Sequence, residues 1–497
     1  MVKLLTLVVL VLSVLVAPAF TGSGTFTILH TNDMHASFIP HEALWVKGSP
    51  KPMVGGFKEL FFIVDSIRHA RKATLLLDAG DVMTGNPITE REYEGAMGGA
   101  LFKMMDMIGY DAWAPGNHDF DVSQENLIRL THIAEFPTVS ANLVNVQGAY
   151  PVGNKPYVIL TVGGLKVGIV GLISQDLYGL VNQNNLVGIK VLSPVETLQK
   201  YADELAQRTD IVVALTHQGV EDDSVMAVNL RGVGIIVGGH SHTRLRKPKV
   251  VNNVVIVQTG SNCENLGELE VTVENHRVVK FDGKLIPLWV RPERPSNALS
   301  GLVDSMQAAI DKDYSEVIGT LDGDWIRGNG ASAIGSFVSE AQRLAAHADV
   351  AFMNTHGIRK DLLRGPMTKR DLFEVLPFRN ILTTFQLSGN QLLGVLHYYL
   401  EHRSGIQIAG LTCTWSMNPD SSVTLADVRV QGKLIENDRM YVCAASDFFV
   451  GEARHYIGME LPQVTFLKET LFEAVEHAVK SEKQITPKIL YRIDKNK

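Results

Sequence analysis

Five short stretches of the chain place Asp, Asn or His directly after an apolar run or a glycine. They are residues 28–35, 75–81, 116–121, 211–217 and 235–242. Carboxylates, carboxamides and imidazoles together offer the mixed oxygen and nitrogen lone pairs that divalent transition cations accept. The candidate donors are Asp33, His35, Asp81, Asn117, His217, His240 and His242.

The apolar runs before these donors are typical of buried strands. In open α/β sheets, functional groups gather beyond the carboxyl ends of the strands. Seven donors are enough for two cations with positions left open for water and substrate oxygens. Asp81 is the candidate bridging ligand, because one carboxylate can bind both cations and Asp33 is already coupled to His35.

Each stretch alone has a simpler interpretation. A lone His at a strand end is commonly a structural residue held by hydrogen bonds. Asn117-His118-Asp119 after a glycine can form a turn or a helix cap. The hypothesis of one metal centre therefore depends on the combination of all five stretches in one half of the chain.

The length and charge of the chain limit the classes of protein to consider. A chain of 497 residues exceeds one ordinary core, so two domains are expected. The net charge of -7 gives no support for binding a nucleic-acid polymer, which requires a basic face.

The N-terminus has the pattern of a secretory signal peptide, predicted over residues 1–19. Lys3 precedes an apolar stretch at 4–16, and Ala17-Pro18-Ala19 forms a small-residue cleavage site. No later segment has the ~20 apolar residues of a membrane span. We therefore expect a secreted or periplasmic protein. Cys413 and Cys443 could pair after export, or they could remain buried free thiols.

Short apolar runs alternate with helical patterns through the N-terminal half. Helices are predicted at 56–71, 98–108 and 196–208, and later strands at 166–172, 254–258 and 269–273. This alternation predicts a layered α/β sandwich with a mixed sheet.

Two prolines with charged neighbours at 291–296 mark a break in the chain. The predicted division is a catalytic domain at 24–290, a linker and connecting helix at 291–314, and a second domain at 315–497.

The donor stretches resemble the signature of the calcineurin-like metallophosphoesterases. More closely, residues 30–35, 116–121 and 238–242 resemble the secreted 5′-nucleotidase and 2′,3′-cyclic-nucleotide phosphodiesterase family. The resemblance implies a four-layer α/β/β/α sandwich followed by an α/β substrate-binding domain. It also implies two divalent ions, which could be Zn, Mn, Fe or Co.

The resemblance assigns roles to further residues. Asp33, His35, Asp81 and His242 would hold one ion, and Asp81, Asn117, His217 and His240 the other. His118 matches the catalytic histidine of the family, and Asp121 matches the aspartate that orients it.

In the C-terminal half, residues 354–359 resemble an Asn-x-x-Gly-x-Arg substrate motif, and 376–380 resemble a Leu-Pro-Phe-Gly-Asn stretch. Asn354 and Arg359 would contact substrate, and Phe378 and Phe448 would sandwich a base. The chain departs from the family after Phe448. It reads Val-Gly-Glu-Ala-Arg-His-Tyr at 450–456, where nucleotidases carry a Gly-Gly-Asp-Gly turn that binds ribose.

These observations favour a phosphohydrolase that acts on a small nucleotide phosphoester by means of a metal-activated water. One alternative keeps the chemistry but changes the substrate to a non-nucleoside phosphoester, a UDP-sugar or a sulfur ester. Another is a nucleotide-binding scavenger without turnover, although a mere binder has no need of seven metal donors.

Overall fold

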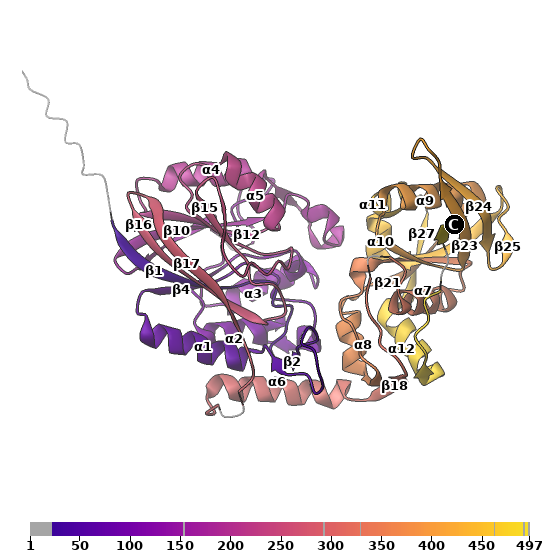
Figure 1. Ribbon diagram of the computed structural model, residues 1–497, viewed down its shortest axis with the longest axis horizontal. Coiled ribbons are helices and arrows are strands. Elements are labelled where there is room, and N and C mark those ends of the chain that lie inside the picture. The colour runs from indigo at the N-terminus through magenta and orange to yellow at the C-terminus, as the bar shows by residue number, and fades with distance from the viewer. Residues whose placement is uncertain are drawn as a thin grey trace, which may run out of the picture.

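The computed structural model describes residues 22–152, 155–291, 294–328, 330–461, 463–490 and 493–495. The predicted signal peptide at 1–19 lies outside these residues. Figure 1 shows a larger lobe, which contains the N-terminal half, and a smaller lobe, which contains the C-terminus.

Two mixed sheets face each other in the larger lobe. One has the strand order β17-β16-β1-β4-β7, and the other has the order β14-β15-β13-β12-β10-β9. In the first sheet, β1 runs parallel to β4 and antiparallel to β16. The strands of the first sheet are β1 (Gly24–Thr31), β4 (Thr74–Asp78), β7 (Ala112–Trp113), β16 (Asn265–Glu274) and β17 (Arg277–Pro287). Those of the second are β9 (Tyr157–Val162), β10 (Leu165–Ile173), β12 (Ile211–His217), β13 (Ile235–Gly238), β14 (Lys249–Val251) and β15 (Val254–Val257).

Both faces of the central strands are buried, which explains their nearly continuous apolar sequence. Ile28 and Leu77 pack into the core between the two sheets. Their neighbours Leu29 and Leu76 pack on the opposite face, against helices. Burying one such side chain contributes about 1.5–3 kcal/mol, so this double-sided core holds the strand ends firmly in place.

Helices cover the outer face of each sheet (Figure 1). The first sheet packs against α1 (Phe57–Ala70), α2 (Gly99–Ile108), α3 (Gln124–Ile133) and α6 (Ala298–Tyr314). The second packs against α4 (Pro194–Leu205) and α5 (Val220–Asn229). The larger lobe is therefore the expected four-layer α/β/β/α sandwich.

The helix predicted at 196–208 begins and ends slightly earlier in the structure. Ser193 accepts a hydrogen bond from the backbone N–H of Glu196, which starts α4 at Pro194. A capping side chain followed by proline is a favoured helix start.

The connecting helix α6 packs on α1 and α2 of the larger lobe before the chain enters the smaller lobe. Its first turn is held by a reciprocal capping interaction between Asn297 and Ser300. Figure 1 shows α6 beneath the larger lobe, with its C-terminal end directed toward the smaller one.

Among its described residues, the smaller lobe contains three sheets and four longer helices. Its main sheet has the order β22-β19-β26-β21-β27. The strands of this sheet are β19 (Val350–Asn354), β21 (Ile381–Ser388), β22 (Ile406–Ala409), β26 (Met440–Ser446) and β27 (Val464–Thr470). The other sheets contain β18 (Val317–Leu321), β20 (Gly365–Thr368) and β28 (Gln484–Ile485), and β23 (Leu411–Met417), β24 (Val423–Val430), β25 (Lys433–Leu434) and β29 (Ile493–Lys495). The helices are α7 (Ala333–Ala345), α8 (Lys369–Val375), α9 (Gly389–His402) and α12 (Leu471–Glu482), with the short α10 (Asp447–Gly451) and α11 (Ala453–Ile457).

Cys413 and Cys443 are both buried and free, so the alternative of buried thiols is the one observed. Among the described residues, no helix combines the length and apolar character needed to cross a membrane.

Candidate metal centre

Two loops of the first sheet extend the parallel pairing of β1 and β4 beyond the strand ends. The backbone N–H of Asp33 donates to the carbonyl of Gly80 at 2.8 Å, and that of His35 donates to the carbonyl of Asp81 at 2.9 Å. The two loops therefore continue the parallel register of the two strands. This pairing places Asp33, His35 and Asp81 side by side.

The backbone of these loops is in the left-handed region. φ is 50° at Asp33, 47° at His35 and 58° at Asp81, and the donors from the second sheet have φ of 79° at His240 and 53° at His242. Such conformations cost of order 1–3 kcal/mol each and cluster at functional sites. Five strained positions at five candidate donors indicate that the backbone is bent to aim these side chains.

Glycines permit the close approach of the loops. A Cβ atom on Gly80 would lie 2.5 Å from the backbone nitrogen of Gly116. A Cβ on Gly116 would lie 2.2 Å from Oδ1 of Asp81 and 2.7 Å from Cε1 of His217. A side chain at either position would therefore displace the donors.

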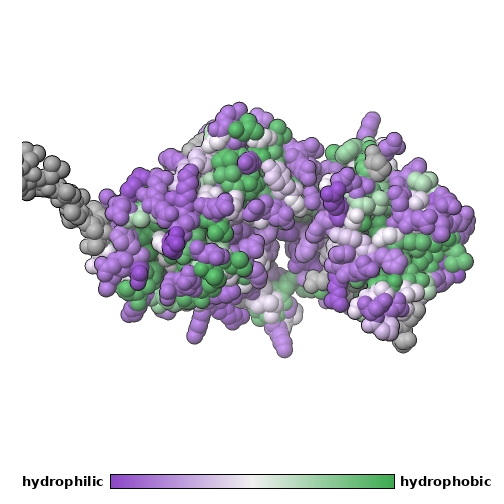
Figure 2. Space-filling model, turned by 90° about the horizontal axis from the view of Figure 1, so that it is seen from above, coloured by the Kyte–Doolittle hydropathy of each residue, from purple (hydrophilic) through white to green (hydrophobic). Residues whose placement is uncertain are grey.

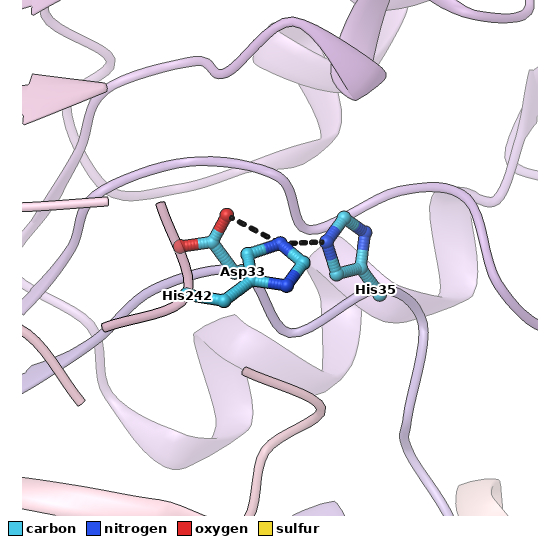
Figure 3. A group of neighbouring side chains, drawn as sticks. All are labelled: Asp33, His35 and His242. Atoms are coloured by element: carbon cyan, nitrogen blue, oxygen red, sulfur yellow. Dashed lines mark hydrogen bonds and ion pairs between the residues drawn. The ribbon is translucent and has the colours of Figure 1, made fainter. Parts of the chain in front are cut away.

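The first donor group consists of Asp33, His35 and His242 (Figure 3). Nε2 of His242 lies 3.3 Å from Oδ1 of Asp33 and 3.0 Å from Nε2 of His35. Asp33 and His35 are buried, and the His242 side chain is 37% exposed. The group is thus open to the cleft on its His242 side.

The second donor group consists of Asp81, His217 and His240. Nε2 of His217 lies 3.1 Å from Oδ2 of Asp81, and Oδ1 of Asn117 lies 3.2 Å from the same nitrogen. Oδ1 of Asn117 is also 2.9 Å from Nδ1 of His240. All seven predicted donors therefore converge, and Asp81 lies between the groups, since its Oδ2 is also 4.0 Å from Nε2 of His35.

Backbone carbonyls orient two of the imidazoles. Nδ1 of His35 lies 3.2 Å from the carbonyl oxygen of Thr84, and Nδ1 of His217 lies 2.7 Å from that of Ala79. A proton on Nδ1 leaves the Nε2 lone pair directed at the centre, as in metal-binding histidines.

The protonation states of His35 and Asp81 suit metal binding, whereas the Asp81 carboxylate outweighs burial and raises the pKa of His217 to about 10. Burial lowers the pKa of His35 well below its ordinary value, and the adjacent His242 lowers it further. Burial alone raises the pKa of Asp81, but His217 and His118 reverse this effect and hold its pKa well below the ordinary value. A neutral imidazole and an ionised carboxylate are the forms that donate lone pairs to a metal.

This donor set fits two divalent cations of the mixed nitrogen and oxygen type. The two ring nitrogens of His35 and His242, 3.0 Å apart, both carry lone pairs when the rings are held as ligands. One cation bound there would accept lone pairs from both nitrogens and from the Asp33 carboxylate.

His118 and Asp121 form a dyad beside the two donor groups. Nδ1 of His118 lies 2.8 Å from Oδ2 of Asp121, and Thr84 donates its hydroxyl to the same oxygen at 2.7 Å. The His118 ring lies 5.3 Å from the His35 ring, and the backbone N–H of His118 donates to Oδ1 of Asp81. The imidazole is thus fixed next to the donors without belonging to either group.

Two residues that support the centre gave no recognisable signal in the sequence. Buried Asp119 accepts the backbone N–H groups of Asp81, Met83 and Gly116, and so ties the loops together. Asn185 donates to the backbone carbonyls of Phe120 and Asp121 at 2.9 and 3.1 Å. Asp119 stands within the 116–121 stretch, but its partners are apparent only in the folded loops.

A cleft of about 1510 Å³ lies between the lobes and contains the centre. Figure 2 shows the constriction that separates the two lobes on one face. In the cleft, the Phe378 ring lies 5.6 Å from the His118 ring, and the Arg359 guanidinium lies 5.9 Å from the centre of the Phe378 ring. Phe378 therefore reaches the His118–Asp121 dyad from the smaller lobe, and Arg359 lies beside it.

Asn354 and Phe448 also line this cleft. Asn354 is buried, and its Oδ1 has no hydrogen-bond partner among the described residues. The Phe448 ring packs against Tyr456 at 6.5 Å. These two side chains extend the wall of the cleft away from the donors.

The segment that replaces the glycine-rich turn forms the short helix α11. Arg454 does not line the cleft and pairs with Glu460 at 2.7 Å. His455 and Glu452 do line the cleft, and Glu452 accepts a long hydrogen bond from Gln183 at 3.4 Å.

Comparison with known proteins supports the class that this site defines. Residues 26–244 match the calcineurin-like phosphoesterase family, and residues 317–458 match the 5′-nucleotidase C-terminal domain. The larger lobe is therefore a metallophosphoesterase fold.

Relatives match across both lobes. A 5′-nucleotidase from Bos taurus is 30% identical over 84% of this chain and 80% of its own length. The crystal structure of a 5′-nucleotidase precursor from Thermus thermophilus is 26% identical, with a TM-score of 0.84 over 95% of this chain and 99% of that one. The trifunctional nucleotide phosphoesterase protein YfkN of Bacillus subtilis is 27% identical over 87% of this chain, which spans only 32% of that longer protein. The chain belongs to the 5′-nucleotidase family.

The central position of Asp81 generates a prediction about metal content. Asp81→Asn should remove the negative charge shared by the two donor groups and leave at least one of them empty. Elemental analysis after dialysis should give about two divalent ions per wild-type chain and at most about one in the variant. Asp176→Asn, which alters a cleft carboxylate outside the donor set, should retain both ions. Full metal content in Asp81→Asn would exclude a bridging role.

Proposed function

We propose that the chain is a secreted two-metal phosphohydrolase that hydrolyses nucleotide phosphoesters. The observation that carries this proposal is the convergence of seven donors and the His118–Asp121 dyad at the floor of a cleft closed by a second lobe. Export rests on the signal-peptide pattern at residues 1–19. We propose the catalytic domain at 24–290, the linker and connecting helix at 291–314, and the substrate-binding domain at 315–497.

Two bound divalent ions would supply Lewis acidity toward phosphoryl oxygens and a water of lowered pKa. Asp33, His35, Asp81 and His242 would hold one ion. Asp81, Asn117, His217 and His240 would hold the other.

His118 acts on the substrate directly in this proposal. Because Asp121 occupies Nδ1, the remaining nitrogen, Nε2, is free to carry a proton toward a phosphoryl oxygen. A donor fixed before the reaction stabilises charge that develops on that oxygen. Thr84 and Asn185 hold the side chain and the backbone of Asp121, so the imidazole keeps its orientation.

The smaller lobe supplies substrate recognition. Arg359 lies beside Phe378 and is attracted by the carboxylates of the centre, where a guanidinium can bind the outer phosphoryl oxygens. Phe378 and Phe448 offer ring faces to a nucleobase, and Asn354 offers an unpartnered oxygen. The base would thus be held by the smaller lobe, and the reacting phosphate by the metal centre together with Arg359.

One observation supports a second candidate substrate class. Helix α11 stands where the ribose-binding turn is expected, and its cleft-lining residues are His455 and Tyr456. A non-nucleoside phosphoester, a UDP-sugar or another acidic ester would use the same centre without that turn.

His118→Ala tests the dyad. Loss of a positioned proton donor should lower kcat by roughly 10²- to 10⁴-fold. Metal content should be unchanged, since the ring belongs to neither donor group. His41→Ala, which removes another cleft-lining histidine, serves as the matched control and should retain activity. Loss of metal together with activity in His118→Ala would instead make His118 a ligand.

The missing turn generates a prediction about the sugar. A carboxylate that binds ribose hydroxyls contributes about 1.5–3 kcal/mol, as hydrogen bonds to charged groups do. Without it, kcat/KM for AMP and dAMP should differ by less than about tenfold, since 1.4 kcal/mol corresponds to a factor of ten.

Steady-state kinetics with AMP, dAMP, ADP, UDP-glucose and a sugar phosphate would measure this preference. A strong preference for AMP would contradict the prediction. If Glu452→Gln then abolished that preference, Glu452 would be the replacement carboxylate.

A further inference from the structure

A short 3-10 helix of the larger lobe, η1 (Pro87–Glu90), contacts the smaller lobe at both of its ends. Before its first residue, Nδ2 of Asn86 donates to Oε1 of Glu374 in α8 at 3.0 Å. At its last residue, Glu90 accepts two hydrogen bonds from Arg379, one from Nε at 2.8 Å and one from Nη2. Figure 1 shows α8 on the side of the smaller lobe that faces the larger one.

η1 is firmly attached to the metal centre. It follows the Asp81 loop after a few residues, and Thr84 in that loop is bonded to Asp121. Asn86 caps its first turn, and residues 87–89 are buried. Glu90 therefore moves with the donors and the dyad rather than independently of them.

On the other side of the contact, Arg379 directly follows Phe378. The Phe378 ring is the part of the smaller lobe that touches His118, at 5.6 Å between ring centres. The motif that residues 376–380 resemble has glycine where this chain has Arg379, and glycine has no side chain to reach Glu90.

Arg370 of α8 pairs with Asp311 of the connecting helix α6 at 3.1 Å, whereas the Arg379–Glu90 pair reaches the larger lobe beyond that helix. Among the described residues, it is the one ion pair that joins a residue before the connecting helix to a residue after it. On the other side of the cleft, the part of the chain that the structure describes forms longer bonds, from Asn182 to Asp447 at 3.3 Å and from Gln183 to Glu452 at 3.4 Å.

We propose that the Arg379–Glu90 ion pair is a lock between the lobes that positions Phe378 against His118. It thereby sets the place of the nucleobase relative to the reacting phosphate. The inference rests on the proposed function for its catalytic consequence. Arg379 is a positioning residue in this scheme, since it acts through Phe378.

The strength of the pair suits a lock that opens during turnover. Two parallel N–H···O bonds give a defined geometry. The Arg379 and Glu90 side chains are 52% and 22% exposed, so solvent screens their attraction and the contact can break.

The experiment compares Arg379→Glu, Glu90→Arg and the charge-swapped double variant. Substrates are AMP and ribose 5-phosphate, which share the phosphoester but differ in the base. Each single variant should raise KM for AMP about three- to tenfold, the scale of an exposed pair replaced by repulsion. KM for ribose 5-phosphate should change less than about twofold, and the double variant should restore AMP to near wild type.

Arg454→Glu is the matched control, because it breaks an arginine–glutamate pair within the smaller lobe. It should leave the AMP to ribose 5-phosphate ratio unchanged. Equal losses for both substrates in Arg379→Glu, or no restoration in the double variant, would overturn the proposal.

A distance measurement tests the lock without any turnover. Spin labels can be placed at two exposed positions, Val279→Cys in the larger lobe and Leu434→Cys in the smaller lobe. Metal-free protein should give one narrow distance distribution, which broadens in each single variant and narrows again in the double variant. An unchanged distribution in Arg379→Glu would overturn the lock. If nucleotides proved not to be substrates, this measurement would still decide whether the lock exists.

Discussion

The whole molecule depends on holding two buried carboxylates, Asp33 and Asp81, close together at the ends of adjacent parallel strands. Like charges in a buried site repel, and each carboxylate also loses its hydration. The chain offsets this cost with facing imidazoles, since His242 approaches Asp33 at 3.3 Å and His217 approaches Asp81 at 3.1 Å. Bound divalent cations would neutralise the same charge, so a site of this kind favours metal over an empty state.

The two-sheet core makes this arrangement rigid. Asp33 and Asp81 come from the first sheet, and His217, His240 and His242 come from the second. The backbone N–H of His240 donates to the Asp33 carboxylate at 2.9 Å, which links the sheets at the centre itself. A close-packed core between the sheets therefore sets the separation of the donors, and the left-handed loop residues are held by that packing.

The candidate donors could be predicted from the sequence because each follows a local pattern, an Asp, Asn or His placed after an apolar run or a glycine. The alternation of strands with helices predicted a layered α/β sandwich with a mixed sheet, and the family resemblance implied its four-layer order. The roles of Asp119 and Asn185 could not be predicted, because both bind backbone atoms of loops that meet only after folding. The place of Arg454 outside the cleft lining depended likewise on the helix α11, which the sequence of the replaced turn did not reveal.

Contacts between the lobes are the least accessible to sequence analysis. Arg379 and Glu90 lie far apart in the chain, and neither belongs to a periodic pattern. Only the folded structure shows that Arg379, which stands where the resembled motif has glycine, bonds across the cleft. For this reason the sequence predicts the substrate-binding residues less completely than it predicts the candidate metal donors.

The central claim is that two cations share Asp81. Anomalous diffraction from crystals of the chain without residues 1–19, grown with Mn²⁺, tests it most directly. The account predicts two peaks per chain, one among Asp33, His35 and His242 and one among Asn117, His217 and His240, both adjacent to the Asp81 carboxylate. A single peak, or a second peak remote from Asp81, would contradict it.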